Sequence, residues 1–283
     1  MEQIIAVSRA LDVDVIAFLL TLPRIYAFLG TSQLLSSGAV PGLARGAAIL
    51  SLTLIAVPIN LGFAADFDRS LGSFALFFGK EYAIGFMLGY LVGWIFWVVQ
   101  SAGALIDNQR GAAIAASIDP LQGFETSPLG NLFSQAFLTF VFTTGAILPV
   151  LMILYQSFAA WPATRGLPVI SPAFPALMLA MMDNAMRMTF VMAAPVLAVM
   201  FFAEFALAIV SRFAPQVQVF ILAMPIKSLL AVMMLIFYFP TLFPYANKQL
   251  DSFYAYTQQF YGLLKYGETL RPPDRPAPSG GTP

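Results

Sequence analysis

NQRGAAIAASIDPLQGFETSPLG, residues 108–130, lies between two of the longest hydrophobic stretches of the chain. It carries Arg110, Asp119 and Glu125 together with two prolines and many small residues. Such a segment is too polar to contact lipid tails, and non-helical backbone at membrane depth is tolerated only where it is buried in protein or lines water. The segment is therefore either an ordinary loop outside the membrane or one that lines or obstructs a pore.

The composition of the chain explains why this segment stands out. Of 283 residues, 59% are hydrophobic and 10% are charged, against about a quarter charged in a typical soluble domain. This balance indicates an integral membrane protein. The 14 basic and 14 acidic side chains cancel, so we expect no nucleic-acid partner.

The amino acids that are missing exclude several kinds of chemistry. The chain has no Cys and no His, which rules out disulfides, thiolate or imidazole metal sites and Ser-His triads. A metal site built from carboxylates alone would be hard to assemble from the 14 acidic residues. We therefore expect no metal, no cofactor and no enzymatic activity.

Hydrophobic runs of helical length predict an all-α fold. A membrane span needs about 20 apolar residues, and a helix satisfies every backbone polar group within lipid. We therefore predict an integral membrane protein of several long, kinked hydrophobic helices. The candidate segments are residues 13–30, 46–65, 74–106, 129–160, 188–210 and 217–243, with a weaker one at 172–182.

Prolines and charges interrupt several of these runs and make the membrane topology unclear. Basic residues are scattered among the loops, so the usual excess on the cytoplasmic side is weak. We infer that much of the apolar surface faces protein instead of lipid. The interrupting residues include Pro23, Arg24, Pro58, Lys80, Glu81, Pro149, Pro195 and Pro215.

The chain is expected to form one membrane domain, residues 1–270, that includes the polar loop 107–127. Apolar and aromatic residues recur at nearly helical spacing over 246–265, which predicts an amphipathic helix at an interface or against a partner. Residues 271–283 are rich in Pro and Gly without core-forming residues, which is typical of a disordered tail.

Three glycines four residues apart, Gly85, Gly89 and Gly93, share one face of the helix expected over 74–106. Small residues at this spacing let another helix backbone approach closely. The face is therefore a candidate for helix packing, within the chain or with another subunit. The alternative is that glycine is simply frequent in membrane helices.

Glu204 and Lys227 are the charges placed deepest within hydrophobic runs. A charge at mid-membrane costs about 2.5–3.5 kcal/mol on insertion scales, so we expect the two to pair, to line water or to face protein. We interpret them as a structural ion pair or as charges at a wet assembly interface. A proton relay is the other possibility.

Two long motifs resemble those of the SctT/FliR family of type III secretion export-apparatus proteins. The first is DNQRGAAIAASIDPLQGFETSPLGNLF at 107–133, and the second is SRFAPQVQVFILAMPIK at 211–227. The order of hydrophobic segments is also similar, so the resemblance covers residues 1–265. TSPLG at 126–130 favours the injectisome branch of the family over the flagellar branch.

The resemblance implies a structural, channel-forming component of the export apparatus in the bacterial inner membrane. Its implied partners are sister subunits of the SctR and SctS types, a switch subunit of the SctU type and a large gate subunit of the SctV type. Together the membrane subunits would form a helical hetero-oligomeric export gate, partly raised toward the periplasm, through which unfolded secreted proteins pass.

The resemblance also implies that residues 107–123 of the polar loop lie in the lumen of the channel as part of a plug. The sequence fits this role, because small residues give the segment low bulk and Ser127–Pro128 is a suitable start for the next helix. The alternative is a connecting loop. The candidate plug residues are Asn108, Gln109, Arg110, Gly111, Asp119, Pro120 and Glu125.

Two other functions are compatible with a chain of this composition. A secondary transporter with broken helices would need corresponding interrupted segments in two halves, and no clear internal repeat is present. An intramembrane enzyme would need paired carboxylates, or a nucleophile with its base, facing a cavity.

Overall fold

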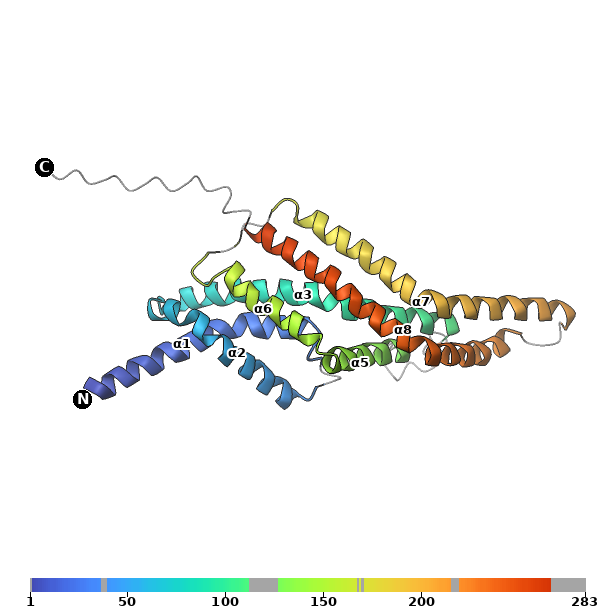
Figure 1. The fold of residues 1–283 in the computed structure, drawn as a ribbon, viewed down its shortest axis with the longest axis horizontal. Coiled ribbons are helices and arrows are strands. Elements are labelled where there is room, and N and C mark those ends of the chain that lie inside the picture. The colour runs from blue at the N-terminus through green and yellow to red at the C-terminus, as the bar shows by residue number, and fades with distance from the viewer. Residues whose placement is uncertain are drawn as a thin grey trace.

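The computed structural model describes residues 2–36, 40–111, 127–166, 168, 171–214 and 219–265. In these ranges the fold is all-α, as the sequence predicted, and it contains no strand. Figure 1 shows an elongated arrangement in which helices of very different length lie side by side. The helices are α1 (Glu2–Thr31), α2 (Gly42–Ala65), α3 (Leu71–Arg110), α5 (Pro128–Thr143), α6 (Ile147–Ala160), α7 (Phe174–Phe213) and α8 (Val219–Leu264).

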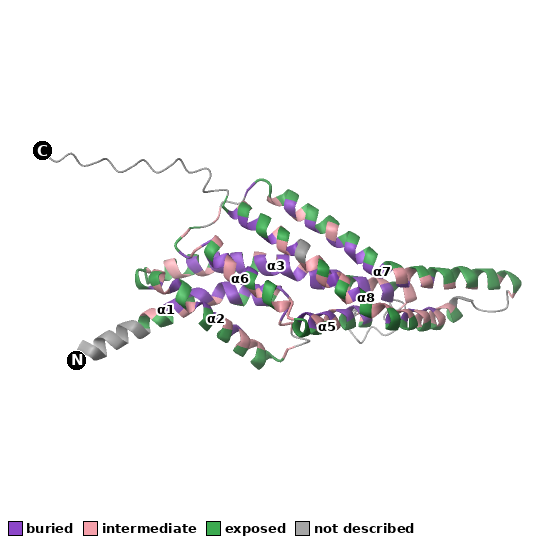
Figure 2. Ribbon diagram, in the orientation of Figure 1, coloured by how far each residue is buried: buried purple, intermediate pink, exposed green. Residues whose placement is uncertain are grey.

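α3 is the central helix of the molecule. It packs against α1, α5, α7 and α8, and Figure 2 shows buried residues along most of its length. The main hydrophobic core forms around it and includes Phe28, Phe96, Phe133 and Phe137, each almost fully buried. Burial of apolar surface on this scale is the dominant stabilising contribution in a packed interior.

Among the described residues, five helices are long and apolar enough to cross a membrane, namely α1, α2, α3, α7 and α8. The pair α5 and α6 would add a sixth span if the two helices are counted together. In the most apolar stretch of α3, 61% of residues are buried, against 22% in α7 and 17% in α8. The last two helices therefore leave most of their apolar surface uncovered by this chain.

The predicted segment 129–160 is not one helix. α5 and α6 meet at an angle of 81°, and the bend lies at Gly145, where φ is +75°. Glycine adopts this left-handed conformation without the steric penalty of a side chain. The bend therefore precedes Pro149, which lies in the first turn of α6.

Other segments that the sequence separated are continuous. From Phe174 on, segments 172–182 and 188–210 belong to the single helix α7. Residues 219–243 join the predicted amphipathic helix, up to Leu264, in α8. α8 contains Pro225, Pro240 and Pro244. A proline removes one backbone hydrogen bond and can kink a helix, but membrane helices tolerate it because neighbouring groups satisfy the freed carbonyl.

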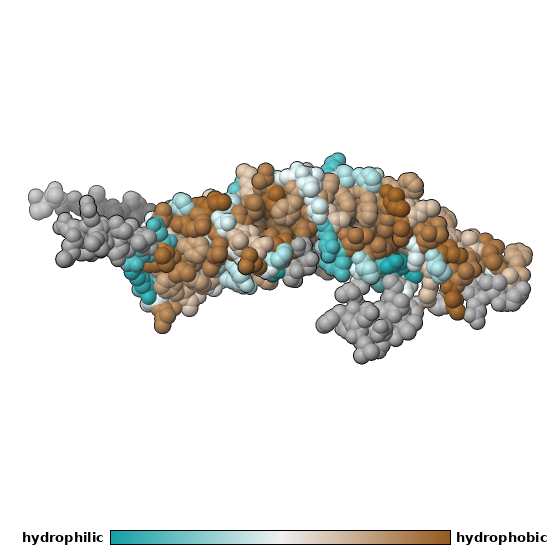
Figure 3. All heavy atoms as spheres, turned by 90° about the horizontal axis from the view of Figure 1, so that it is seen from below, coloured by the Kyte–Doolittle hydropathy of each residue, from teal (hydrophilic) through white to brown (hydrophobic). Residues whose placement is uncertain are grey.

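The surface is as apolar as the composition requires. Figure 3 shows hydrophobic residues over most of the face seen from below, with hydrophilic residues in small groups. On α7 the exposed side chains include Phe201, Phe202 and Phe205, and on α8 they include Ile236 and Phe237. Continuous apolar surface of this kind faces lipid or protein and not water.

Candidate functional site

The polar segment begins later than the sequence suggested. Residues 108–110 form the last turn of α3, and Gly111 ends the helix in the left-handed conformation with φ of 91°. Such a conformation is common directly after a helix and favours glycine. The predicted plug residues Asp119, Pro120 and Glu125 lie outside the described residues.

The far end of the segment begins α5 as predicted. Ser127 is the N-cap, and its hydroxyl accepts a hydrogen bond of 2.9 Å from the backbone N–H of Gly130. Pro128 occupies the first helical position, where its missing N–H leaves no intrahelical bond unmade. The expected start of this helix is therefore confirmed.

Asp107 ties the two ends of the segment together. Its Oδ2 accepts hydrogen bonds from the Ser127 hydroxyl at 2.5 Å and from the backbone N–H of Leu129 at 2.8 Å. Its Oδ1 forms an ion pair of 2.7 Å with Arg110, and the Asp107 side chain is 2% exposed. The Asp107 carboxylate in the last turn of α3 therefore binds the start of α5 and neutralises Arg110. We call these contacts of Asp107 with Arg110, Ser127 and Leu129 the Asp107 staple.

Close backbone packing reinforces the Asp107 staple. A Cβ atom at Gly103 of α3 would lie 2.6 Å from the backbone oxygen of Leu129, and one at Gly130 of α5 would lie 3.0 Å from the backbone oxygen of Gln100. Glycine is the residue that permits two helices to approach this closely. The helices that precede and follow residues 112–126 therefore pack closely against each other.

Glu204 of α7 and Lys227 of α8 lie together beside this junction. Lys227 Nζ is 3.0 Å from Glu204 Oε2. Gln109 joins both residues, because its side chain donates to Glu204 at 3.4 Å and its carbonyl accepts from Lys227 at 3.3 Å. The Lys227 side chain is 11% exposed and that of Glu204 is 52% exposed, so Lys227 is largely buried and Glu204 reaches the surface of this chain.

The three predicted packing glycines contact α1. A Cβ atom at Gly85 would overlap the backbone oxygen of Arg24, and one at Gly93 would lie 2.8 Å from the backbone oxygen of Thr31. Gly89 contacts α1 between these two points. The glycine face therefore brings α3 against α1 within the same chain.

A buried charge cluster holds the other end of α3, and the sequence did not predict it. Arg24 and Glu81 are both fully buried, and Arg24 Nε donates to Glu81 Oε2 at 2.6 Å. Arg24 also donates to the Ser157 hydroxyl at 3.2 Å and to the backbone oxygen of Trp161 at 2.9 Å. These bonds satisfy the guanidinium, as a buried charge requires.

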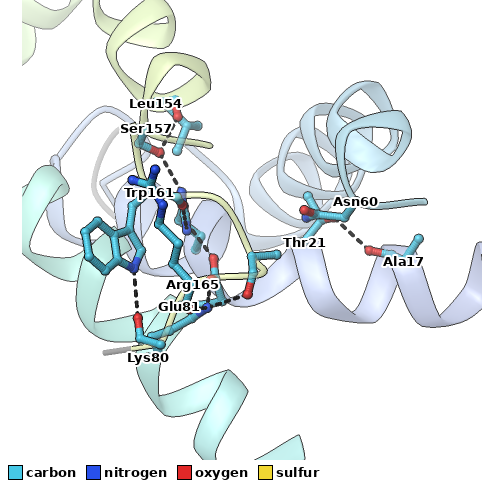
Figure 4. Close-up of polar contacts among 12 residues, drawn as sticks. Ala17, Thr21, Asn60, Lys80, Glu81, Leu154, Ser157, Trp161 and Arg165 are labelled. Carbon is cyan, nitrogen blue, oxygen red and sulfur yellow. Dashed lines mark hydrogen bonds and ion pairs between the residues drawn. The ribbon is translucent and has the colours of Figure 1, made fainter. Parts of the chain in front are cut away.

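Lys80 extends the cluster to the connection between α6 and α7. Its Nζ lies 3.1 Å from Glu81 Oε1 and donates to the backbone oxygens of Ala163 and Arg165 at 2.9 and 2.8 Å. Figure 4 shows Lys80, Glu81, Trp161 and Arg165 gathered at this place. Lys80 and Glu81 thus fasten the α6–α7 connection to α3, which gives the interruptions seen in the sequence a structural role.

The described residues offer no metal site. No group of three or more Asp or Glu side chains there is arranged to hold a metal ion. The carboxylates of Glu81, Asp107 and Glu204 each face basic groups instead. Charge in this part of the chain serves helix packing and helix termination.

Comparison with known proteins identifies the family. The sequence model described as "Bacterial export proteins, family 1" matches residues 15–253, which is most of the chain. The chain belongs to this export family. The match includes both motifs quoted above, the Asp107 staple and the Glu204–Lys227 pair.

Relatives within the export family cover most of the chain. The Yop proteins translocation protein T of Yersinia pestis is 36% identical over 234 residues, covering 82% of this chain and 89% of the relative. The surface presentation of antigens protein SpaR of Salmonella typhimurium is 33% identical, covering 74% and 78%. The flagellar biosynthetic protein FliR of Bacillus subtilis is 33% identical, covering 78% and 85%.

Proposed function

We propose that this chain is a channel-forming subunit of a type III protein export apparatus in the bacterial inner membrane. Membership of the export family is the observation that carries the proposal. Relatives named for translocation, for surface presentation of antigens and for flagellar biosynthesis support a role in export. The role is structural, and no catalytic step is assigned to any residue.

The proposed partners cover the apolar faces of α7 and α8. Sister subunits of the SctR and SctS types would complete a helical assembly with this chain, and subunits of the SctU and SctV types would dock on its cytoplasmic side. Unfolded secreted proteins would pass through the assembly. The support is the low burial of α7 and α8, 22% and 17% in their most apolar stretches, because such surface needs protein or lipid against it.

Within this assembly, residues 112–126 would act as a plug that keeps the resting channel closed. A filler of this kind must be polar, small in bulk and anchored at both ends. The Asp107 staple supplies the anchors, because it joins Gly111 at the end of α3 to Ser127 at the start of α5. Gln109 links the same junction to Glu204 and Lys227.

A secondary transporter is less well supported. That architecture usually contains broken helices at corresponding positions of two repeats. The described residues contain one pair of helices bent by more than 40°, α5 and α6, and no second pair that would correspond to it.

Shortening residues 111–117 tests the plug. The shortened chain should still purify from native membranes with small multi-copy membrane subunits, but resting membranes should become leaky to small ions or dyes. A variant with residues 112–117 shuffled in order and Gly111 kept in place, and therefore of wild-type length and composition, is the matched control. Tight membranes with the shortened, assembled protein would reduce the segment to a connecting loop.

Co-purification tests the wider proposal independently. A chain that is monodisperse, well folded and without partners after mild extraction would contradict a role as an assembly subunit. In that case the leak experiment would have no channel to report on, so the two failures can be distinguished.

A further inference from the structure

A polar cavity of about 400 Å³ lies where the end of α1, the start of α2, the second half of α3 and the start of α5 meet. Arg45 lines it together with four amide side chains, those of Gln33, Gln100, Asn131 and Gln135. The described part of the chain contributes no carboxylate to this lining. None of the residues of the Asp107 staple lines the cavity, so it is a separate feature of the surface.

Arg45 has no counter-charge among the described residues. It is half-buried and forms no ion pair and no side-chain hydrogen bond with them. Its Nε is buried without an acceptor, whereas its two terminal nitrogens are accessible. The other buried or half-buried cations of the described helices each contact a carboxylate of this chain, namely Arg24, Lys80, Arg110 and Lys227. A charge within a membrane segment is normally paired, so the partner of Arg45 comes from elsewhere.

The amide side chains set a second requirement for the occupant. Those of Gln33 and Gln135 form no hydrogen bond with a described residue, and Gln100 forms one, of 3.5 Å, with Asn131. Each amide offers an acceptor oxygen as well as N–H donors. A carboxylate or phosphate alone only accepts, so it would leave these oxygens unmatched. A polypeptide segment with an acidic side chain supplies both the anion and N–H donors.

The backbone at Gln33 also indicates a binding role. Its φ is 61°, and it is the one described non-glycine residue with a positive φ. Glycine adopts this left-handed conformation without steric cost, whereas a residue with a side chain is strained. Residues held in such conformations cluster at ligand-binding sites. Here the strained residue places an amide in the lining of the cavity.

We propose that this cavity receives an acidic segment of another membrane subunit of the export apparatus. A Glu or Asp carboxylate of that subunit binds the terminal nitrogens of Arg45, and its N–H groups donate to the amide oxygens of Gln100 and Gln135. This inference rests on the proposed role as an assembly subunit. It adds a contact distant in sequence from the apolar faces of α7 and α8, because neither helix lines the cavity.

The surroundings of the cavity favour protein over lipid as its occupant. Leu43, two residues before Arg45, is 90% exposed, and Leu132 of α5 is 48% exposed. Polar amides within an apolar surface are typical of contacts between membrane helices, where they form hydrogen bonds across the interface. Leu35 is the one large apolar side chain that the described residues contribute to the lining, so the cavity offers little surface for an acyl chain.

Replacement of Arg45 tests the contact in the complete export complex, extracted in mild detergent. Arg45→Gln should speed the dissociation of a co-purifying membrane subunit about tenfold, as expected for loss of one charge-assisted contact. Arg45→Lys should recover part of the loss, because it keeps the charge but not the planar fork. Arg69→Gln is the matched control, since Arg69 is exposed and does not line the cavity. Equal dissociation from wild type and Arg45→Gln would overturn the inference alone, whereas a wild-type chain without partners would overturn the proposed function as well.

Filling the cavity tests the same contact without removing a charge. Gly30 lines the cavity, and a Cβ atom there would meet no other atom within 4 Å. Gly30→Leu should therefore leave the fold of this chain intact but obstruct the partner, with dissociation as fast as for Arg45→Gln. Gly46→Leu is the control, because its Cβ atom also meets open space and Gly46 does not line the cavity. Equal dissociation from these two leucine variants would contradict the inference.

Cross-linking identifies the occupant. A photo-crosslinking amino acid in place of Gln135, which lines the cavity and is exposed, should label a peptide of another membrane subunit that contains Asp or Glu. Replacing that carboxylate by its amide should speed dissociation as Arg45→Gln does, and the two changes together should add nothing further. Labelling of lipid would overturn the inference. So would labelling of residues 112–126 of this chain, which carry Asp119 and Glu125.

Discussion

Replacing Asp107 tests whether one carboxylate holds the two ends of the candidate plug. Asp107→Ala leaves two donors, the Ser127 hydroxyl and the Leu129 N–H, without their acceptor, and it leaves the Arg110 guanidinium without its ion-pair partner. Breaking a buried ion pair costs about 3–5 kcal/mol. Arg110 keeps 19% exposure of its side chain, so water compensates part of the loss and we expect about 3 kcal/mol. Asp107→Asn retains an acceptor oxygen and should lose roughly half as much.

The assay is the loss of intact complex with temperature, measured by size-exclusion chromatography of heated samples. If the relation for soluble domains of 150–250 residues holds, about 3 kcal/mol corresponds to a decrease of about 6–12 °C in Tm. Asp107→Ala should also release proteins or ions through resting membranes, since its loss frees one end of the segment. Asp107→Asn should lie between wild type and Asp107→Ala in both measurements.

Asp68, between α2 and α3, provides the matched control. Its carboxylate accepts hydrogen bonds from the Ser70 and Ser73 hydroxyls at 2.9 and 2.7 Å, yet it is fully exposed. The Ser73 and Ser70 hydrogen bonds hold the pKa of Asp68 below its usual value, so its contribution is present at neutral pH and is lost as pH falls through that lowered pKa. Asp68→Ala should melt close to wild type. If Asp107→Ala and Asp68→Ala have the same Tm, the reasoning about the Asp107 staple is refuted.

Three further changes probe the other contacts of α3. Gly89→Leu should sharply lower the yield of assembled complex, because even a Cβ atom there overlaps the backbone of α1. Gly79→Leu is the control and should not lower the yield, because the space around Gly79 is open. Equal yields would contradict the packing role of Gly89. A double-mutant cycle of Glu204→Gln and Lys227→Met should give a coupling free energy of about 0.5–1 kcal/mol in thermal stability. The coupling is small because Glu204 is half exposed. Purely additive effects would mean that the two residues are not partners. Arg24→Met should lower the free energy of unfolding in denaturant by about 3–5 kcal/mol. The reason is that Glu81 then remains as a buried charge with Lys80 as its one partner. Wild-type stability would contradict the role of the buried cluster.

Structural features were predictable from the sequence wherever the determining residues lie close together along one helix. Ser127 and Pro128 predicted the start of α5 because a cap and a proline at the first position act on the following three residues. The spacing of Gly85, Gly89 and Gly93 predicted a face for close helix packing, and the structure places it against α1. Hydrophobic length alone predicted the all-α membrane class.

Contacts between residues far apart in the chain were not predictable. Arg24 and Glu81 are separated by 57 positions, and each was interpreted only as an interruption of its own span. Asp107 and Ser127 are 20 positions apart, and nothing in the intervening sequence specifies that they meet. The bend at Gly145 was missed because the hydrophobic pattern continues through it, and only its positive φ separates α5 from α6.

The joining of predicted segments into the single helices α7 and α8 also has a physical reason. Proline and charge were interpreted as ends of helices, which is correct in water, where the freed backbone groups can bind solvent. In an apolar setting, ending a helix exposes several backbone groups with no water to satisfy them. Continuing the helix through Asp183 and Arg187 in α7, and through Pro244 in α8, leaves fewer such groups unsatisfied, so the helices remain long.

The uncovered faces of α7 and α8 have a consequence for how the cell makes this protein. A newly synthesised copy has Phe201, Phe202 and Phe237 exposed. Until other chains cover these side chains, the copy presents apolar surface of the kind that misfolded proteins also expose. Chaperones and membrane proteases recognise such surface, and partner binding removes it by mass action. The steady-state amount of this chain should therefore follow the supply of its partners, with surplus copies degraded, so that subunit ratio is set after synthesis and not only by gene expression.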